Sequence, residues 1–215
     1  MNLVLLGAPG AGKGTQGALL AGRIGAHKLA TGDLLREAVR AGSELGRRAK
    51  SYMDAGELVP DALILDLVRD TLAQGDSDPK AIFDGFPRTV PQAESLNVML
   101  RELGTPLDGV VVIDVPEEKI VQRMSGRRTC SDCGRIYNLH TDPPAQRDVC
   151  DVCGGKLTQR VDDHEETVRH RLSVYREATE PLIAFYENSS IPVHRVDGDR
   201  PVEQVQSQIL ERLGR

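Results

Sequence analysis

A glycine-rich segment near the start of the chain constrains the fold more than any other feature: GAPGAGKGT at residues 7–15. It follows a short apolar run at residues 2–6, which is typical of a buried parallel strand, and it leads into a helical pattern over 13–24. Glycines let the backbone curl until successive N–H groups point at one anion, and the positive end of the helix adds to that field. The segment therefore predicts a strand, a phosphate-binding loop and a helix, with ATP or a related triphosphate as the ligand.

The match to the general phosphate-loop pattern G-x4-G-K-S/T has one departure. Gly14 occupies the last position of the pattern, and the hydroxyl comes one residue later, at Thr15. The sequence therefore leaves open whether Thr15 reaches a nucleotide-bound Mg²⁺ directly or through water.

Short apolar runs and helical patterns alternate along most of the chain. Further strands are expected at residues 81–84, 109–114 and 193–196. Further helices are expected at 32–41, 44–55, 61–74, from Pro116 to about 124, from a capping box at Asp163 and Glu166 to about 188, and at 202–213. This alternation predicts a doubly wound α/β fold with a parallel sheet. Residues 126–159 interrupt it with a segment rich in Cys, Gly, Pro and Asp, which predicts a small inserted subdomain.

All cysteines of the chain lie in that inserted segment, as two C-x2-C pairs separated by sixteen residues: Cys130, Cys133, Cys150 and Cys153. Structural disulfides are rare in a cytosolic chain, whereas Zn²⁺ prefers four soft ligands in a tetrahedron. Four thiolates leave no open position for a substrate, so the site is expected to be structural. Redox-active cysteine pairs are the alternative interpretation, and the spacing does not distinguish zinc from iron.

Charge and hydropathy exclude several classes of protein. The net charge of −5 makes the chain a poor general binder of nucleic acid or of anionic membranes. No apolar run approaches 18 residues, which argues against a membrane span. The first residues lack a basic region, and their apolar stretch is too short for a secretory signal. We therefore expect a cytoplasmic protein.

The basic residues are unevenly divided, with 21 Arg against six Lys. Genomic base composition is one explanation. A requirement for planar guanidinium groups, which grip phosphate oxygens in pairs, is the other. The excess of Arg over Lys does not by itself distinguish these two explanations.

Six motifs together resemble those of adenylate kinases, and they occur in that family's order over essentially the whole chain. They are GAPGAGKGT at 7–15, TGDLLR at 31–36, DGFPRT at 84–89 followed by Gln92, GRR at 126–128, RVDD at 160–163 and ETVRHR at 166–171. The four-cysteine segment is similar to the lid of the long, zinc-bearing bacterial members of the family.

The resemblance implies the P-loop nucleoside monophosphate kinase fold, with a parallel five-stranded sheet flanked by helices. It also implies three parts: a core of residues 1–29, 60–125 and 160–215, a helical NMP-binding segment of residues 30–59, and a zinc-stapled lid of residues 126–163. The implied partners are ATP and AMP or ADP, without nucleic acid or membrane, and the implied oligomeric state is a monomer.

The implied site residues fall into several groups. The catalytic group is Lys13, Arg88, Arg123, Arg127, Arg160 and Arg171. The ATP-binding group is Gly10, Ala11, Gly12, Lys13, Gly14, Thr15, Arg127, Ile136, Tyr137 and Arg200. The AMP-binding group is Thr31, Arg36, Glu57, Leu58, Val59, Gly85, Phe86, Pro87, Arg88, Gln92, Arg160 and Arg171. Asp84 is linked to Mg²⁺ through water, Asp162 and Asp163 form the lid hinge, and the four cysteines hold the metal.

The implied reaction is reversible transfer of the γ-phosphoryl group from Mg-ATP to AMP, giving two ADP. The acceptor is a phosphate oxygen that is largely ionised at neutral pH, so a general base is not needed, and arginines should dominate the site. Two alternatives remain. One is a kinase acting on UMP, CMP or GMP, which the long lid and Gln92 disfavour. The other is a zinc-ribbon nucleic-acid module on an ATPase, which the acidic balance of residues 130–153 disfavours.

Overall fold

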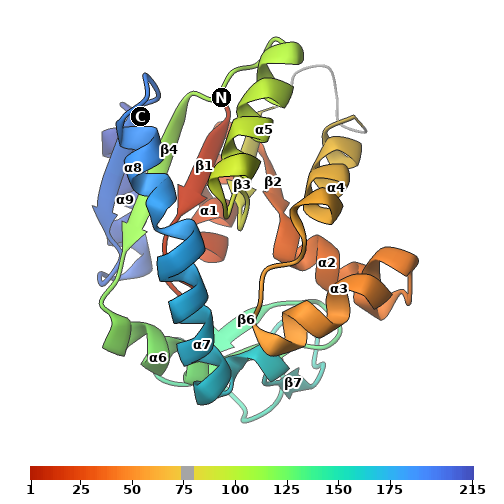
Figure 1. Ribbon diagram of the computed structural model, residues 1–215. Helices are drawn as coiled ribbons and strands as arrows, with labels where there is room; N and C mark the ends of the chain where they lie inside the picture. The colour runs from red at the N-terminus through yellow and green to blue at the C-terminus, as the bar shows by residue number, and fades with distance from the viewer. Residues whose placement is uncertain (74–79) are drawn as a thin grey trace.

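Five parallel strands form the central sheet of the computed structural model, which describes residues 1–73 and 80–215. In spatial order they are β2 (His27–Ala30), β3 (Ala81–Asp84), β1 (Leu3–Leu6), β4 (Gly109–Asp114) and β8 (Val193–Asp197). In the register of the sheet, Leu5 lies opposite Asp84 on one side and Val111 on the other. The predicted α/β fold with a parallel five-stranded sheet is confirmed (Figure 1).

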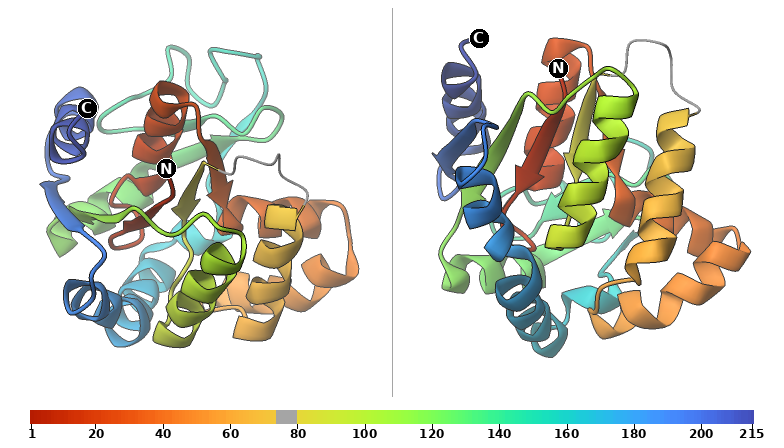
Figure 2. Two further views of the ribbon diagram at one scale, coloured as in Figure 1. Left: turned by 90° about the horizontal axis from the view of Figure 1, so that it is seen from above. Right: turned by 45° about the horizontal axis from the view of Figure 1, so that its top comes forward.

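Helices cover both faces of the sheet. The helices α1 (Lys13–Ile24) and α9 (Val202–Arg212) lie on one face, and α5 (Val90–Glu102) and α8 (Pro181–Glu187) lie on the other (Figure 2). Side chains of the central strand β1 alternate between two buried clusters, one on each face, because successive residues of a strand point in opposite directions. All four residues of β1 are buried, which explains why the strand has a continuous apolar sequence.

The order of the strands places the start of the chain at a switch point. Strand β1 lies in the middle of the sheet, and its neighbours β3 and β4 come from later parts of the chain on opposite sides. In open parallel sheets a ligand-binding crevice forms outside the carboxyl ends of the strands at such a point. The glycine-rich loop leaves β1 at this position.

Two groups of helices extend the molecule at the carboxyl edge of the sheet. The first comprises α2 (Thr31–Arg40) and α3 (Glu44–Ala55), and the second comprises α6 (Glu117–Gly126) and α7 (Glu165–Val174), whereas α4 (Asp61–Ala73) packs beside α5 on the main core. The helices α2 and α3 pack against each other, and Gly46 permits their close approach, since a Cβ atom there would lie 2.1 Å from the carbonyl oxygen of Ala38. The pair projects to one side of the sheet (Figure 1).

The inserted segment forms a separate three-stranded antiparallel sheet. Its strands, in the order β6 (Ile136–Asn138), β5 (Arg127–Cys130) and β7 (Leu157–Thr158), lie beyond the carboxyl ends of the main strands (Figure 1). Its small buried cluster consists of Cys130, Tyr137, Cys150 and Leu157. The predicted interruption of the α/β alternation is therefore correct.

The predicted elements agree closely with the structure in most places. The bounds expected for α1, α3, β3 and β4 are those observed, and most other ends differ by one or two residues. The expected last residue of α4, Gln74, lies outside the described residues. The pattern did not predict β2, which begins with the polar pair His27 and Lys28, or α5, whose turns mix polar and apolar residues.

Two expectations near the end of the inserted segment are wrong. Asp163 does not cap a helix: it lies in a short 3₁₀ turn, Val161–Asp163, the N-cap of α7 is His164, and the Asp163 carboxylate binds Arg127 instead. The long helix expected to reach about residue 188 is divided by a π-helical turn at Tyr175–Thr179. A buried guanidinium is a stronger partner for Asp163 than a backbone N–H at a helix end.

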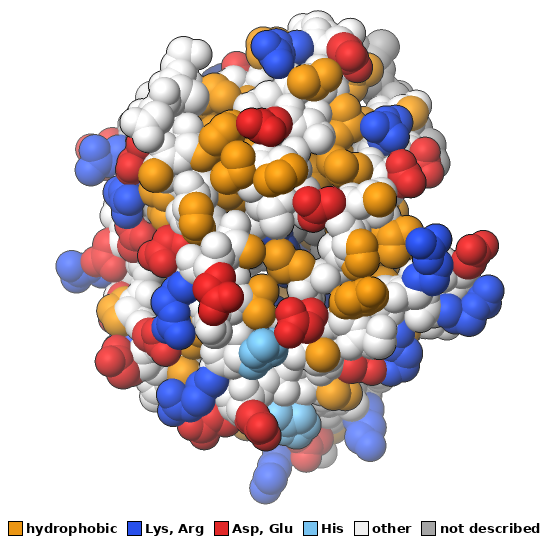
Figure 3. Space-filling model, in the orientation of Figure 1, with side chains coloured by type: hydrophobic (Ala, Val, Ile, Leu, Met, Phe, Trp, Pro, Cys, Tyr) orange, Lys and Arg blue, Asp and Glu red, His pale blue; other side chains and the backbone are white. Residues whose placement is uncertain are grey.

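The surface seen in Figure 3 differs between its upper and lower halves. Hydrophobic side chains gather over the upper half, where α4 and α5 lie in Figure 1, and acidic and basic side chains gather over the lower half. The lower half is the one at the carboxyl ends of the strands. Over the described residues, no helix has the length and apolar character needed to cross a bilayer.

Candidate active site

The glycine-rich loop wraps around the start of α1. Gly10 has a φ of 86°, and a Cβ atom there would lie 2.7 Å from Cγ of Met124, so the position requires glycine on both counts. The Lys13 ammonium donates hydrogen bonds to the carbonyl oxygens of Gly7 at 2.6 Å and Ala8 at 2.9 Å. The lysine is therefore held against the loop that the motif predicts to bind phosphate.

The surroundings of Lys13 are short of compensating negative charge. Burial is the main cause that lowers the pKa of Lys13 to about 8; Asp84 opposes the shift, and the charges of Arg88, Arg171 and Arg127 add to it. A buried ammonium near three guanidinium groups is a site that a polyanion would stabilise.

Asp84 ends β3, the strand beside β1. Its carboxylate lies next to the first turn of α1, since Oδ2 would be 3.4 Å from a Cβ atom at Gly14. The sequence prediction placed a carboxylate here beside the phosphate loop, and the structure brings the two together.

Two arginines from distant parts of the chain face this region. Arg88 follows the turn after β3, and its Nε donates to the carbonyl oxygen of Gly85 at 2.8 Å. Arg171, on α7, donates from Nη1 to the Asp162 carboxylate at 2.5 Å and to the Asp162 carbonyl oxygen at 3.1 Å. Burial lowers the pKa of Arg88, and it lowers the pKa of Arg171 to about 10. Both guanidinium groups are thus fixed in place while remaining partly desolvated.

A third arginine joins the two ends of the inserted segment. Arg127 at its start donates from Nε and Nη2 to the two carboxylate oxygens of Asp163 at 2.8 and 2.5 Å. The Asp163 side chain is 0% exposed, so this is a buried, bidentate ion pair. Arg160 donates to the Thr129 hydroxyl at 3.0 Å, and burial, followed by the charges of Arg36 and Arg127, lowers its pKa to about 10.

A pocket opens between α2, α3 and the turn after β3. Most residues of the expected AMP-binding group line it, together with Asp162 at the hinge: Thr31, Arg36, Glu57, Leu58, Val59, Gly85, Arg88, Gln92 and Arg171. The Thr31 hydroxyl donates to the carbonyl oxygen of Gly85 at 2.9 Å, which ties the start of α2 to the same turn. The pocket combines apolar walls with three guanidinium groups.

Some expected AMP-site residues point elsewhere. Phe86 is 0% exposed and belongs to the main core. Pro87 follows it through a cis peptide bond. The Glu57 carboxylate contacts Nε2 of His170 at 2.5 Å. Phe86 and Pro87 therefore lie outside the lining of the pocket, whereas Glu57 lines it while its carboxylate contacts His170.

Arg123, expected near the ATP phosphates, and the residues expected around the base of ATP are dispersed. Arg123 donates to the carbonyl oxygen of Gly198 at 2.9 Å and to the Asp199 carboxylate at 3.3 Å. Arg200 is 59% exposed and forms an ion pair with Asp197 at 2.7 Å. Ile136 is 43% exposed on the lid.

Tyr137 differs from its neighbour Ile136 because its side chain is 2% exposed. Its hydroxyl accepts the backbone N–H of Asp151 at 2.8 Å and lies 3.5 Å from Sγ of Cys150. The guanidinium of Arg135 covers the ring at 5.1 Å from its centre. The Tyr137 side chain therefore serves the interior of the lid, and only its backbone is left for a nucleotide.

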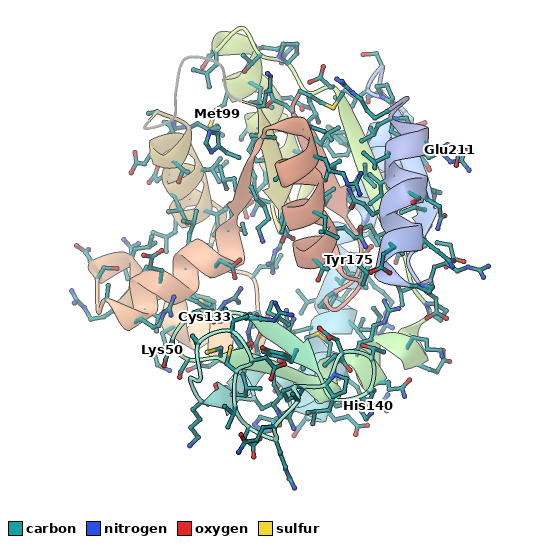
Figure 4. All side chains as sticks on the ribbon, turned by 180° about the vertical axis from the view of Figure 1, so that it is seen from behind. Lys50, Met99, Cys133, His140, Tyr175 and Glu211 are labelled. Atoms are coloured by element: carbon teal, nitrogen blue, oxygen red, sulfur yellow. The ribbon has the colours of Figure 1, made fainter. Side chains whose placement is uncertain are left out.

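The four cysteine sulfurs lie together, all within 4.8 Å of one another. The Cys130 and Cys153 sulfurs are 3.4 Å apart and the Cys133 and Cys150 sulfurs are 3.6 Å apart, too far for disulfide bonds. Sulfur atoms beside the Cys133 label mark this cluster in Figure 4. Among the described residues, it is the one group of His, Cys, Asp and Glu side chains with the geometry to hold a metal ion.

Comparison with known proteins decides the family. A family model described as adenylate kinase matches residues 5–191. The chain belongs to the adenylate kinase family. An adenylate kinase of Archaeoglobus fulgidus is 50% identical over 99% of each chain. One of Thermodesulfovibrio yellowstonii is 50% identical over 99% of each chain, and one of Acidothermus cellulolyticus is 49% identical over 99% of this chain and 98% of its own length.

The family assignment confirms what the motifs predicted about fold and enzyme class. Adenylate kinases are phosphotransferases, and the match extends along the whole chain. The match to the adenylate kinase family over residues 5–191 contradicts the alternative of a zinc-ribbon module on an unrelated ATPase.

The structure also reveals a residue that the sequence analysis treated only as the beginning of a helix. Asp61 accepts hydrogen bonds from the side chains of Gln92 and Thr89. No local signal marks this role, because the partners lie 28 and 31 residues away in the chain.

Proposed function

We propose that this protein transfers the γ-phosphoryl group of Mg-ATP reversibly to AMP, through the residues of the site described above. The observation that carries the proposal is the convergence of Lys13, Arg88, Arg127 and Arg171 at the carboxyl edge of the sheet, beside the pocket lined by Gln92. This arrangement suits two polyphosphate groups that must meet end to end.

The donor nucleotide would occupy the loop at 7–15. The backbone N–H groups of Gly10 to Thr15 and the Lys13 ammonium would hold its outer phosphates. Asp84 is placed to bind water molecules of the accompanying Mg²⁺, which would neutralise phosphate charge. Arg123 and Arg127 are proposed to approach the ATP phosphates from the hinge of the lid. The lid residues Ile136 and Tyr137, together with Arg200 after β8, are proposed to contact the base of ATP, with Tyr137 acting through its backbone.

The acceptor would occupy the pocket between α2 and α3. Arg36, Arg88 and Arg171 would bind the AMP phosphate, and Thr31, Leu58, Val59 and Gln92 would surround its base. Because the acceptor oxygen is already ionised near neutral pH, the side chains orient the phosphates and neutralise charge, and none has to remove a proton.

The lid is proposed to hold a structural zinc ion and to exclude water. Sulfur separations of 3.4 and 3.6 Å are close to the roughly 3.8 Å expected for a tetrahedron with Zn–S bonds of about 2.3 Å. The Arg127–Asp163 pair joins both ends of this lid, and Arg160 extends from it toward the site. Exclusion of water protects the transferring group from hydrolysis.

The domain division stays a proposal with structural support. Residues 30–59 contain α2 and α3, residues 126–163 contain the lid sheet, and residues 1–29, 60–125 and 160–215 contain the main sheet. We also propose that the protein acts as a cytoplasmic monomer.

The direct test is a transfer assay with Mg-ATP against AMP, UMP, CMP and GMP. ADP should form from both nucleotides with AMP as the preferred acceptor. Preference for UMP, or release of inorganic phosphate as the main product, would contradict the proposal.

A matched variant tests the acceptor side. Arg88→Lys keeps the charge but loses the planar group that donates to Gly85 and to phosphate together. We expect kcat and the affinity for AMP to fall at least about tenfold while ATP binding changes little. Near-normal turnover would show that paired hydrogen bonds from Arg88 are not required.

A further inference from the structure

We infer that Asp61 is a specificity-determining residue, because it fixes the orientation of the Gln92 carboxamide and so favours adenine over a 6-oxopurine in the acceptor pocket. The inference rests on the proposed function, in which Gln92 faces the base of AMP. It assigns a positioning role to a residue that lies outside the expected site.

The side-chain amide of Gln92 is held by a hydrogen bond at its nitrogen and another at its oxygen. The Gln92 side chain is 2% exposed and lines the pocket. Its Nε2 donates to Oδ1 of Asp61 at 2.6 Å, and its Oε1 accepts the backbone N–H of Arg88 at 2.8 Å. The other carboxylate oxygen of Asp61 accepts the Thr89 hydroxyl at 3.0 Å.

The chemistry of these partners determines which way the amide points. An ionised carboxylate can only accept hydrogen bonds, and a backbone N–H can only donate. Rotating the Gln92 amide by 180° would place oxygen against the Asp61 oxygen and N–H against the Arg88 N–H. Asp61 and Arg88 therefore hold one orientation, with one N–H and one lone pair of the amide left for a ligand.

The N–H and the lone pair that the Gln92 amide leaves for a ligand distinguish adenine from a 6-oxopurine. Adenine presents an N6 donor beside the N1 acceptor, whereas hypoxanthine and guanine present an O6 acceptor beside the N1–H donor. A glutamine that could rotate freely would match either edge. A glutamine held by Asp61 matches one order of donor and acceptor, and the opposite order leaves buried polar groups unpaired.

The sharpest probe is IMP, since it replaces the N6 donor and N1 acceptor of AMP by the opposite pair and keeps the size of the purine. We would measure kcat/KM for AMP and for IMP with Mg-ATP as donor. In Asp61→Asn the side chain keeps its shape but can offer either a donor or an acceptor to Gln92. Only the Arg88 N–H then still favours the original orientation of the amide, so the opposite orientation becomes accessible.

We expect the ratio of kcat/KM for AMP to that for IMP to fall about tenfold in Asp61→Asn, through the KM values of the two acceptors. The KM for ATP should stay unchanged. Any general effect of removing a negative charge near the phosphates applies to both acceptors and cancels in the ratio. Asp61→Ser provides a second variant, because its hydroxyl can also donate or accept.

Thr89→Val is the matched control. It removes the other hydrogen bond of the same carboxylate, together with the Thr89 side-chain cap of α5, and leaves the Asp61–Gln92 contact in place. This variant should lose thermal stability but keep the AMP-to-IMP ratio of the unmodified protein.

Two results separate the inference from the proposed function. If folded Asp61→Asn and Asp61→Ser both keep the original ratio within twofold, the inference is wrong while the proposed function stands. If the unmodified protein does not phosphorylate AMP at all, the proposed function itself fails.

Discussion

The parallel-sheet core and the lid reach their folded states by different means. The core buries one hydrophobic cluster on each face of the sheet, built from strands and helices along most of the chain. The lid buries one small cluster, in which two of the four members are cysteines. A subdomain of this size gains little from apolar burial, so the metal ion that we propose for its four cysteines would hold its loops together, whereas the core is stabilised by its own apolar burial.

The two regions meet at a polar boundary. The buried Arg127–Asp163 pair closes the base of the lid, and Arg171 of α7 binds the neighbouring Asp162. The transferring phosphates of the proposed reaction lie on the same boundary. In the proposed reaction, phosphoryl transfer would take place where the apolar core meets the lid.

The variant with the largest expected effect should lose phosphoryl transfer while both the core and the lid stay folded. Lys13→Met deletes the ammonium that faces the outer phosphates, so phosphoryl transfer should fall by at least about 100-fold, equivalent to ~2.7 kcal/mol in the barrier. Circular dichroism and the metal content should not change. Lys50→Met, at an exposed ion pair on α3, is the control and should keep the original rate. A Lys13→Met rate above about a tenth of normal would show that the charge does not act on the transferring group.

Removal of the metal should unfold the lid and leave the core folded. Elemental analysis should find one zinc per chain, and Cys130→Ser or a strong chelator should unfold the lid while the far-ultraviolet signal of the core persists. Loss of a structural metal site costs several kcal/mol of local stability, on the order of a native disulfide or more. Ser131→Ala, next to the same ligand, should retain metal. Absence of metal, with all four thiols titrating freely in the native protein, would contradict the comparison.

The free energy of unfolding should depend on pH through Lys13, which lies at the start of α1 in the core. The pKa of Lys13 is lowered by burial to about 8 from 10.5, so between these values the unfolded chain binds a proton that the folded protein has released. The free energy of unfolding should therefore rise with pH in this window, relative to Lys13→Met, by at most about 1.4 kcal/mol per pH unit. Urea unfolding at several pH values from 7.5 to 10 measures the difference. A flat difference between the two proteins would show that Lys13 is not desolvated.

The smallest effect concerns a single hydroxyl in the lid. Tyr137→Phe removes the acceptor of the Asp151 N–H and the contact with Cys150 Sγ, which should cost about 1 kcal/mol of lid stability. Metal should transfer to a chelator more quickly, since groups that bind metal ligands tune their affinity. Tyr52→Phe, on the exposed surface of α3, should leave metal release unchanged. If Tyr137→Phe and Tyr52→Phe release metal equally, the hydroxyl does not support the site.

The sequence by itself determined those features whose cause is local. The phosphate loop at 7–15 is specified by closely spaced glycines and a lysine, and the candidate metal site by the spacing of its cysteines. Buried strands such as β3 and β4 were predicted with their observed bounds, because short continuous apolar runs are typical of strands buried on both faces of a parallel sheet.

Only the tertiary structure decided which partner each polar side chain takes. Asp163 has the sequence context of a helix cap, yet it binds Arg127, 36 residues away. Tyr137 stands beside Ile136 in a strand, yet it turns toward Cys150, and Asp61 begins a helix yet orients Gln92. Local patterns describe neighbours along the chain, whereas a buried charge or amide pairs with whatever the packing of distant elements brings within about 3 Å.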